Sequence, residues 1–354
     1  MDVESRLDAV SALRRIAFLL ERAREDTYKV KAYRAAAAAL GALSADEVRA
    51  RAEAGTLTEL AGIGATTATV ITQAVRGEVP DRLRLVEEEL GGEQTTGGRA
   101  VRSALRGDLH SHSDWSDGGS PIAEMARTAA ELGHDYLVLT DHSPRLKVAR
   151  GLSAARLSQQ LEVVDEVNAD PAIAAAATSE SGFRLLKGIE VDILDQGELD
   201  QSEEMLARLD VRVASVHSKL AMPAAAMTAR MIAAVESPFT NVLGHCTGRL
   251  TGGSRGRRDE SVFDARAVFE ACAAHGVAVE INARPERRDP PTRLLELAIE
   301  LGCLFSIDSD AHAPGQLDLQ IYGCERVEQL GLELDRIVNT WSIERLLAWA
   351  APRV

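Results

Sequence analysis

The chain has 354 residues, of which 45% are hydrophobic and 27% are charged. This composition is typical of a globular protein of about two domains and excludes wholesale disorder. The formal net charge of −14, from 40 basic and 54 acidic residues, argues against a protein that wraps nucleic acid with an overall basic surface.

Cysteine usage and hydropathy indicate the compartment. The four cysteines contain no Cys-x-x-Cys pair, and no apolar stretch has the length of a membrane span. The first residues lack the basic and apolar segments of a signal peptide. We therefore expect reduced thiols and a cytoplasmic protein without a membrane partner; the oligomeric state is not predicted.

Residues 1–90 predict an all-α domain, because apolar residues recur at helical spacing. Within it, Leu60-Ala61-Gly62-Ile63-Gly64 has the pattern of a helix-hairpin-helix turn. Backbone amides at the start of the following helix can bind a DNA phosphate, so Gly62, Ile63 and Gly64 are candidate DNA-binding residues. Ala65, Thr66 and Thr67 stand where a DNA-binding hairpin usually offers a lysine, which keeps open a purely structural, glycine-rich helix connection.

A polar, glycine-rich stretch follows the helical domain. Residues 91–103 include Gly91-Gly92 and Gly97-Gly98 and predict a linker. The second domain is expected over residues 104–354.

Seven short apolar runs alternate with amphipathic segments in this second domain, which predicts parallel β/α units and favours a barrel over an open sheet. The expected strands are 105–109, 136–140, 185–189, 211–216, 241–244, 277–281 and 303–307. The expected helices are 121–132, 154–168, 224–236, 261–275 and 291–301.

Six of the eight histidines lie at the end of a predicted strand or in the turn that leaves it. They are His110, His112, His142, His217, His245 and His312. The other two, His134 and His275, sit beside a glycine at a helix end, where a capping role is expected. The carboxyl ends of parallel barrel strands meet on one face, so the six imidazoles are expected to converge.

Carboxylates occur in the same places as these histidines, namely Asp117, Glu190 and Asp310. Imidazoles and carboxylates without a thiolate form a ligand set for Zn²⁺, Mn²⁺ or Fe²⁺. The nine side chains are too many for one ion and suffice for two or three ions that share a bridging ligand. The alternative is a set of scattered core and surface histidines.

The motifs resemble those of the PHP (polymerase and histidinol phosphatase) domain, in order, over residues 105–350. The matching segments are His110-Ser111-His112, Asp117, Thr140-Asp141-His142, Gly188-Ile189-Glu190, Ser215-Val216-His217-Ser218, Gly244-His245 and Ser309-Asp310-Ala311-His312. The segments DWSDG, TDHSPRLKVARGL and EINARPERRDPP look like the C-terminal PHP domain of bacterial family X DNA polymerases. Residues 14–80 resemble the N-terminal DNA-binding domain of the same polymerases.

The resemblance implies an α/β fold, a distorted (β/α)7 barrel that holds three divalent ions (Mn, Zn or Fe), behind a small helix-hairpin-helix domain. It implies that the first ion is held by His110, His112, Glu190 and Asp310. Glu190 would bridge to a second ion, completed by His217 and His245. The third ion would be held by Asp117, His142 and His312. Glu190, Asp310 and His312 are the candidate catalytic residues, and Cys246 departs from the proline expected after His245.

This ligand set predicts a phosphoesterase. Two ions that share Glu190 would hold a bridging water and lower its pKa from near 15.7 to roughly 7, giving a hydroxide that attacks phosphorus. Cations at strand ends could clamp the phosphate, although each is equally compatible with a solvated surface position. They are Arg145, Lys147, Lys219, Arg249 and Arg284.

Three functions remain open. The first is metal-dependent hydrolysis of DNA, as a 3′–5′ exonuclease, 3′-phosphatase or abasic-site endonuclease. The second is a small-molecule phosphatase such as a histidinol-phosphatase, and the third is a non-catalytic DNA-binding or assembly module. No DNA polymerase activity is expected, because no paired Asp-x-Asp lies between the hairpin and the predicted barrel.

Overall fold

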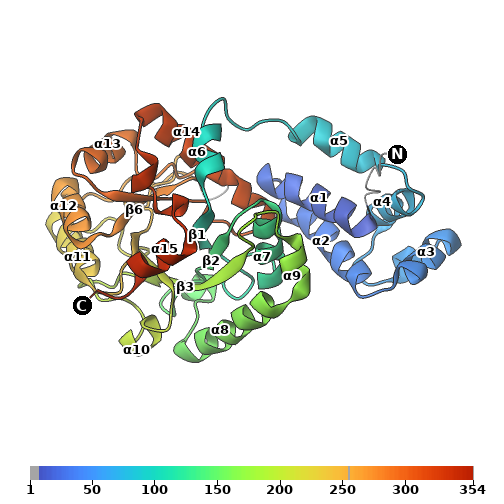
Figure 1. Cartoon of the computed structure of the whole chain (residues 1–354), viewed down its shortest axis with the longest axis horizontal. Coiled ribbons are helices and arrows are strands. Elements are labelled where there is room, and N and C mark those ends of the chain that lie inside the picture. The colour runs from blue at the N-terminus through green and yellow to red at the C-terminus, as the bar shows by residue number, and fades with distance from the viewer. Residues whose placement is uncertain (1–7, 254–255, 354) are drawn as a thin grey trace. The chain divides into compact units, whose positions relative to one another are not determined.

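The chain divides between Gln94 and Thr95 into a helical unit and a unit in which strands and helices alternate (Figure 1). The computed structural model describes residues 8–253 and 256–353. No helix within these ranges is long and apolar enough to cross a membrane.

The helical unit is organised around its first helix. It contains α1 (Ala9–Arg22), α2 (Thr27–Gly41), α3 (Ala45–Ala54), the short η1 (Leu57–Glu59), α4 (Ala65–Val75) and α5 (Asp81–Leu90). Helix α1 packs against α2, α4 and α5. Its apolar face, with Leu13, Ile16 and Leu20, is fully buried in this contact, and such packing supplies most of the stability of short helices.

The predicted hairpin is a tight turn between η1 and α4. Gly62 has a φ of +87°, and a Cβ at this position would lie 3.3 Å from Cβ of Ala35. Both the backbone conformation and the lack of space therefore require glycine. Gly64 begins α4, and its backbone N–H donates to Oγ1 of Thr67 at 3.0 Å.

Seven parallel strands form the second unit, and each pairs with the next strand along the chain. The strands are β1 (Gly107–Ser111), β2 (Tyr136–Leu139), β3 (Arg184–Asp192), β4 (Val211–Ser215), β5 (Val242–Leu243), β6 (Ala278–Asn282) and β7 (Leu304–Asp308). This order confirms the predicted β/α barrel.

Helices cover the outside of the barrel (Figure 1). They are α6 (Arg99–Ala104), α7 (Ile122–Glu131), α8 (Ala154–Ala169), α9 (Pro171–Ala176), α10 (Glu203–Leu206), α11 (Ala224–Glu236), α12 (Ala265–His275), α13 (Thr292–Glu300), α14 (Gln320–Leu330) and α15 (Ile343–Ala350). The short helices are η2 (Lys147–Ala149), η3 (Pro314–Leu319), η4 (Leu334–Arg336) and η5 (Val338–Thr340).

Side chains join the first and last strands. Asp308 Oδ1 accepts from the Leu109 N–H at 3.0 Å, and Asp108 Oδ1 accepts from the Ser309 N–H at 3.3 Å. Asn339, from η5, donates to the carbonyl of Gly107 at 3.2 Å and to Asp308 Oδ1 at 3.0 Å. Buried polar side chains therefore close the barrel between β1 and β7, and several predicted ligands lie in the segments that follow these two strands.

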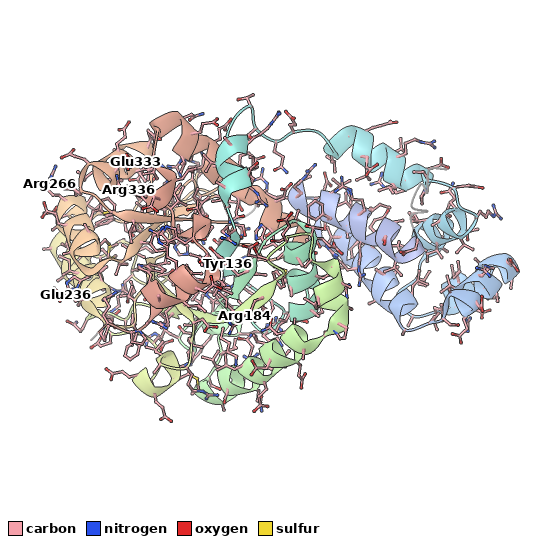
Figure 2. The ribbon with its side chains drawn as sticks, viewed as in Figure 1. Tyr136, Arg184, Glu236, Arg266, Glu333 and Arg336 are labelled. Atoms are coloured by element: carbon pink, nitrogen blue, oxygen red, sulfur yellow. The ribbon has the colours of Figure 1, made fainter. Side chains whose placement is uncertain are left out.

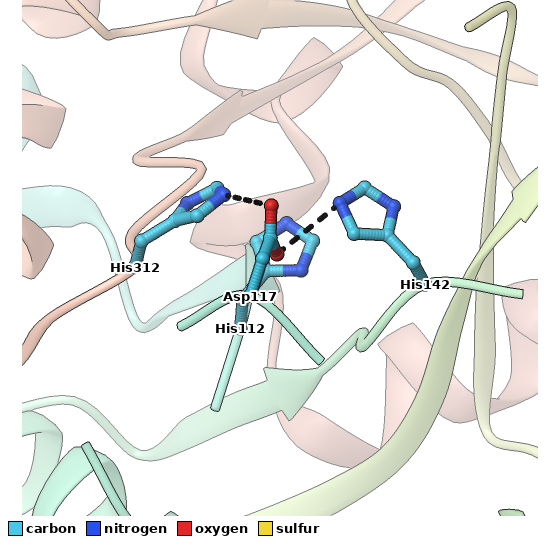
Figure 3. A group of neighbouring side chains, drawn as sticks. All are labelled: His112, Asp117, His142 and His312. Atoms are coloured by element: carbon cyan, nitrogen blue, oxygen red, sulfur yellow. Dashed lines mark ion pairs between the residues drawn. The ribbon is translucent and has the colours of Figure 1, made fainter. Parts of the chain in front are cut away.

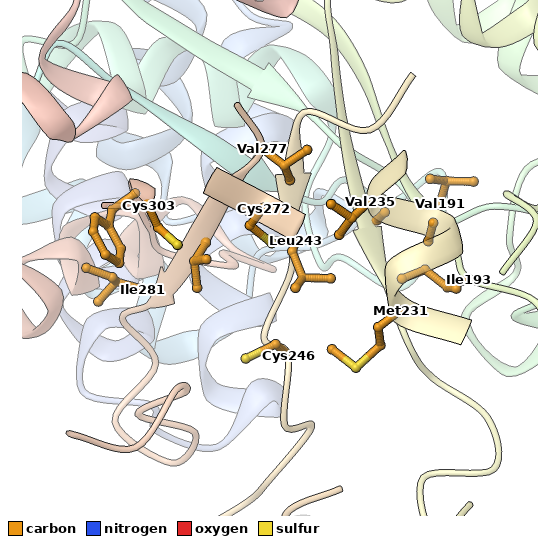
Figure 4. Close-up of a cluster of buried hydrophobic side chains, with 14 of the residues drawn as sticks. Val191, Ile193, Met231, Val235, Leu243, Cys246, Cys272, Val277, Ile281 and Cys303 are labelled. Carbon is orange, nitrogen blue, oxygen red and sulfur yellow. The ribbon is translucent and has the colours of Figure 1, made fainter. Parts of the chain in front are cut away.

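The main apolar core lies between the strands and the helices around them. Strand residues such as Val191 and Leu243 pack against Met231 and Val235 of α11 (Figure 4). The four cysteines are free and buried, as expected for reduced thiols. Charged residues such as Glu236 and Arg266 are exposed on α11 and α12, whereas Tyr136 is buried in the barrel (Figure 2).

The structure differs from the predicted linker over residues 91–103, because residues 99–103 belong to α6. This segment is fastened to the barrel unit. The Gly98 N–H donates to Glu328 Oε2 at 2.7 Å, and Val101 and Leu105 join the main apolar core. Burial of these two side chains outweighs the flexibility that the glycine-rich composition predicted.

Candidate metal centre

The nine predicted ligands lie where strands of the barrel end. His110 is in β1 and Glu190 in β3, whereas the other seven stand in the segments that follow β1, β2, β4, β5 and β7. These seven are His112, Asp117, His142, His217, His245, Asp310 and His312. Strand β6 contributes none of the nine.

Glu190 lies at the middle of this group and is 1% exposed. Its Oε2 is 2.9 Å from Nδ1 of His142 and 3.3 Å from Nε2 of His110. Its Oε1 is 2.9 Å from Nε2 of His245 and 3.1 Å from Nε2 of His217. His112 Nε2 also lies 3.5 Å from Oε2. The two oxygens thus face different sets of imidazoles, which is the arrangement that a bridging carboxylate requires.

A second cluster surrounds Asp117 (Figure 3). His142 Nε2 is 3.4 Å from Asp117 Oδ1, and His312 Nε2 is 3.4 Å from Asp117 Oδ2. His112 joins them, and one donor atom from each of the four residues lies within 4.8 Å of the others. His142 therefore reaches both Asp117 and Glu190 through its two ring nitrogens.

A third cluster consists of His110, His112 and Asp310, whose donor atoms also lie within 4.8 Å of one another. Asp310 Oδ1 is 3.4 Å from Nε2 of His112. His112 belongs to this cluster and to that around Asp117. The centre is accordingly a set of overlapping clusters, and all nine predicted ligands take part in the contacts of this group.

The pKa values of these groups are shifted in both directions. Although burial opposes it, Glu190 and Asp192 raise the pKa of His217 to about 9, and Glu190 and Glu280 raise the pKa of His110 well above its ordinary value. Burial, reinforced by His312 and His142, lowers the pKa of His112 to about 3. Burial and the Arg287 cation lower the pKa of His245 to about 4. Although burial opposes it, the imidazoles around Glu190 hold the pKa of that carboxyl well below its ordinary value. Neutral imidazoles and ionised carboxylates are the ligand forms.

The donor set fits divalent cations. Nε2 of His110 and Nε2 of His112 are buried and have no hydrogen-bond partner among the described residues. Both nitrogens instead face the same carboxylate oxygen, Oε2 of Glu190, at 3.3 and 3.5 Å. Buried polar atoms without partners are rare in folded proteins, and a cation between such donors would satisfy them.

Two buried carboxylates behind the imidazoles were not predicted from the sequence. Asp192 Oδ1 is 3.2 Å from Nδ1 of His217, and Glu280 Oε1 is 2.5 Å from Nδ1 of His110. Carboxylates that bind the far nitrogen of an imidazole fix the orientation of its metal-binding nitrogen. The sequence feature that could have identified Asp192 and Glu280 is a charged residue within a predicted buried strand or directly after it.

Two arginines flank Asp310. Arg287, which was not predicted, places Nε 3.1 Å from Asp310 Oδ2. Arg284, a predicted phosphate-binding residue, donates from Nη1 to the Asp310 carbonyl at 3.0 Å and lies 3.0 Å from Nδ1 of His312. Both guanidinium groups are buried and add positive charge to this side of the centre.

The other predicted cations have different surroundings. Arg249 donates to the carbonyl of Arg287 at 3.0 Å and pairs with Glu260, so it fastens the loop after β6. Lys219 pairs with Asp195 at 2.5 Å. Arg145 and Lys147 are exposed on the loop that follows His142.

The predicted DNA-binding residues belong to the helical unit. Ile63 is buried in the apolar core of that unit, whereas Gly62 and Gly64 are exposed in the turn before α4. The backbone N–H groups of Ile63 and Gly64 donate to the Leu60 carbonyl at 3.2 Å and to Thr67 Oγ1 at 3.0 Å, so the two glycines, rather than the Ile63 side chain, form the exposed surface of this turn.

The PHP domain family matches residues 108–284, and the helix-hairpin-helix domain family matches residues 5–79. The chain belongs to the PHP family. It also carries a helix-hairpin-helix domain.

PHP-family relatives include two kinds of protein. The DNA polymerase/3′-5′ exonuclease PolX of Bacillus subtilis (strain 168) is 36% identical over 245 residues, which are 69% of this chain and 41% of PolX. The chain thus spans less than half of the length of PolX. A protein named probable phosphatase, from Thermoanaerobacter sp. (strain X514), is 26% identical over 244 residues, which are 66% of this chain and 89% of that protein.

A solved structure with a more distant likeness is histidinol phosphate phosphatase from Lactococcus lactis, in complex with zinc, L-histidinol and phosphate. It has 16% sequence identity and a TM-score of 0.46, and the match covers 65% of this chain and 95% of that one.

Proposed function

We propose that this protein hydrolyses phosphoester bonds of DNA, at a strand end or an abasic site, with three divalent ions (Mn, Zn or Fe). The observation that carries the proposal is the convergence of nine imidazole and carboxylate side chains, with Glu190 at the middle of the group, in a chain that also has a helix-hairpin-helix domain. The likeness to an exonuclease-bearing polymerase supports DNA over other phosphoesters.

The nine side chains divide among three ions, two of which share Glu190. His110, His112, Glu190 and Asp310 would hold the first. Glu190, His217 and His245 would hold the second, and Asp117, His142 and His312 the third. Bound divalent ions supply Lewis acidity, which polarises a phosphoryl oxygen and brings the pKa of a bound water to about 7.

Protein groups orient these ligands and prepare the site for an anion. Asp192 and Glu280 hold His217 and His110 through the nitrogens that face away from Glu190. Arg284 adds a fixed positive charge beside His312, where it would favour the negative charge that develops on phosphorus oxygens. Glu190, Asp310 and His312 are the residues we assign to the reacting centre.

The hairpin would contribute DNA affinity through the backbone at the start of α4. The Gly64 N–H is already bonded to Thr67 Oγ1, so a phosphate would compete with that hydroxyl or use the amides of Ala65 and Thr66. Both of these residues are exposed. A positive helix terminus without a lysine predicts a weak, salt-sensitive contact.

The deciding experiment compares three substrates in Mn²⁺- or Zn²⁺-supplemented buffer: a 3′-recessed duplex, an abasic-site duplex and histidinol phosphate. Glu190→Ala is the inactive control. Thr66→Glu places a negative charge at the start of α4, which suits the helix dipole but repels a phosphate. Thr69→Glu, one turn along the same exposed face, is the matched control.

We expect cleavage of an oligonucleotide that is lost in Glu190→Ala. In Thr66→Glu, KM for DNA should rise by about tenfold, which is equivalent to about 1.4 kcal/mol of binding free energy. The rate at which this variant hydrolyses histidinol phosphate should equal that of the wild type. Thr69→Glu should behave like the wild type. Turnover of histidinol phosphate alone would overturn the proposal.

A small-molecule phosphatase is the second candidate. Two observations favour it. The Thr67 hydroxyl already accepts the hydrogen bond of the Gly64 N–H, which a DNA phosphate would need, and the net charge of −14 opposes DNA binding. In that case the helix-hairpin-helix domain is a packing module, and Thr66→Glu changes no activity.

A further inference from the structure

We infer that Glu280, on the strand that supplies no predicted ligand, is a positioning residue that couples two of the ion sites by holding His110 and His245. The inference rests on the metal centre of the proposed function. It extends that centre to β6 and assigns a role to a residue that does not itself contact an ion.

Burial makes the role of Glu280 specific. The residue is 0% exposed and lies in β6, all of whose residues are buried. A carboxylate in such surroundings is costly unless its oxygens are hydrogen-bonded. The hydrogen-bond partners of Glu280 therefore indicate the role of this buried carboxylate.

These partners belong to the metal centre. Oε1 of Glu280 is 2.5 Å from Nδ1 of His110, and Oε2 accepts from the backbone N–H of His245 at 2.5 Å. The Asn282 amide nitrogen is 3.3 Å from Oε2 of Glu280 and 3.1 Å from Oδ2 of Asp310. One carboxylate thus contacts His110 of the first ion site and His245 of the second, and reaches Asp310 through Asn282.

The contact with His110 selects the nitrogen that faces the centre. A proton on Nδ1 of His110 is held by Glu280, so the lone pair is left on Nε2. That nitrogen is 3.3 Å from Glu190 Oε2 and is buried without a hydrogen-bond partner among the described residues. A carboxylate on the far nitrogen fixes both the tautomer and the ring orientation of a metal-binding histidine.

Glu280→Gln separates this role from simple space filling. The glutamine keeps the size of the side chain, and its single amide oxygen can still accept from the His245 N–H. Its NH₂ group then faces Nδ1 of His110 and demands an acceptor there. The proton of His110 would move to Nε2, which could no longer bind an ion.

The first test measures ion binding rather than catalysis. Mn²⁺ and Zn²⁺ are titrated into the full-length wild type, Glu280→Gln and Ser306→Ala, with circular dichroism as a check of folding. Ser306 is the matched control because it pairs with Glu280 in the β6–β7 register and is equally buried. Its hydroxyl has no hydrogen-bond partner in the part of the chain that the structure describes.

We expect Glu280→Gln to bind its ions about 10- to 100-fold more weakly, with reduced stoichiometry, and Ser306→Ala to match the wild type. Wild-type affinity and stoichiometry in folded Glu280→Gln would overturn the inference, as would equal losses in the two variants. Because no substrate is used, a failure to cleave DNA overturns the proposed function and leaves this result intact.

A second measurement reads the tautomer in the wild type and needs no variant of Glu280. Nitrogen–proton correlations of the histidine rings in Zn²⁺-loaded wild type, with His110 assigned by its loss in His110→Gln, report the tautomer. The expected result is a proton on Nδ1 of His110 and zinc on Nε2. Zinc on Nδ1, or an Nε2 proton, would overturn the inference.

Discussion

The two units of the chain bury very different side chains. In the described part of the helical unit, the buried polar side chains are Glu21 and Thr67. Each is bonded within the unit, Glu21 to Arg34 at 2.6 Å and Thr67 to Gly64 at 3.0 Å. The barrel unit buries many more polar side chains. One of them is His112, whose Nε2 has no hydrogen-bond partner within the described ranges.

This difference separates a unit that needs only its own packing from one that needs a ligand. The buried side chains of Glu21 and Thr67 are satisfied by the fold of the helical unit, so the stability of this unit is expected to depend on apolar contacts. The barrel holds imidazoles and carboxylates close together, and these groups gain partners when a cation binds. Buried polar atoms without a hydrogen-bond partner reduce stability, so they are expected at functional sites.

The largest expected effect tests the centre of the barrel. Glu190→Gln removes the charge that His110, His142, His217 and His245 surround. We expect kcat/KM for bis(p-nitrophenyl) phosphate to fall by at least about 10³-fold, because bound ions contribute several kcal/mol to charge stabilisation. Metal content should fall with it. Glu236→Gln, an exposed carboxylate on α11, is the control, and near wild-type turnover in Glu190→Gln would contradict the site.

The second prediction tests whether the stability of the helical unit depends on its apolar contacts. Leu13 is fully buried between α1 and its neighbours, so Leu13→Ala should lower the free energy of unfolding of this unit by about 2 to 5 kcal/mol. Hydrolysis of a small diester should be unchanged. Denaturant unfolding of the full chain measures the first quantity, and Leu85→Ala, at a position 48% exposed, is the control. A loss of diester hydrolysis would show that the units depend on each other.

Sequence patterns could predict the strands and the histidines because both depend on local information. The predicted helix over residues 224–236 coincides with α11 (Ala224–Glu236), since its amphipathic repeat and flanking proline are read directly from the sequence. The convergence of six histidines followed from their place after parallel strands. The ligand positions therefore needed only the topology.

The supporting residues could not be predicted in the same way. Glu280 and Asp192 contact particular imidazoles because of strand register and barrel closure, which no local pattern contains. Arg249 has a long side chain whose partners, Glu260 and the carbonyl of Arg287, lie 11 and 38 residues further along the chain. The α6 helix was predicted as linker because glycine composition does not reveal that Val101 is buried against the barrel unit.

The third prediction concerns metal and stability. An ion that binds the folded barrel stabilises it by about 2.7 kcal/mol at 100 times its Kd. We expect Mn²⁺ or Zn²⁺ to raise the melting temperature of the barrel transition in calorimetry and to leave that of the helical unit unchanged. A chelator should reverse the shift, and Glu190→Gln should reduce it. Equal shifts in both transitions would show that the ion effect is not specific to the centre.

The smallest expected effect compares one kind of helix cap in the two units. Ser44 caps α3, where its hydroxyl accepts from the Glu47 N–H and its own N–H donates to the Glu47 carboxylate. Ser342 caps α15 in the barrel unit and accepts from the Arg345 N–H. Replacement of either serine by alanine should cost about 1 kcal/mol, each in the transition of its own unit.

The cost of Ser44→Ala should depend on pH. Hydrogen bonds from the backbone and hydroxyl of Ser44 lower the pKa of Glu47 below its ordinary value of 4.5. The ionised carboxylate therefore stabilises the helical unit above that value, and this contribution is lost as the pH falls through the lowered pKa. Ser44→Ala should thus cost less at pH 3 than at pH 7 in thermal unfolding. An equal cost at both pH values would show that Glu47 takes no part in the cap, and the helical unit would then depend on packing alone.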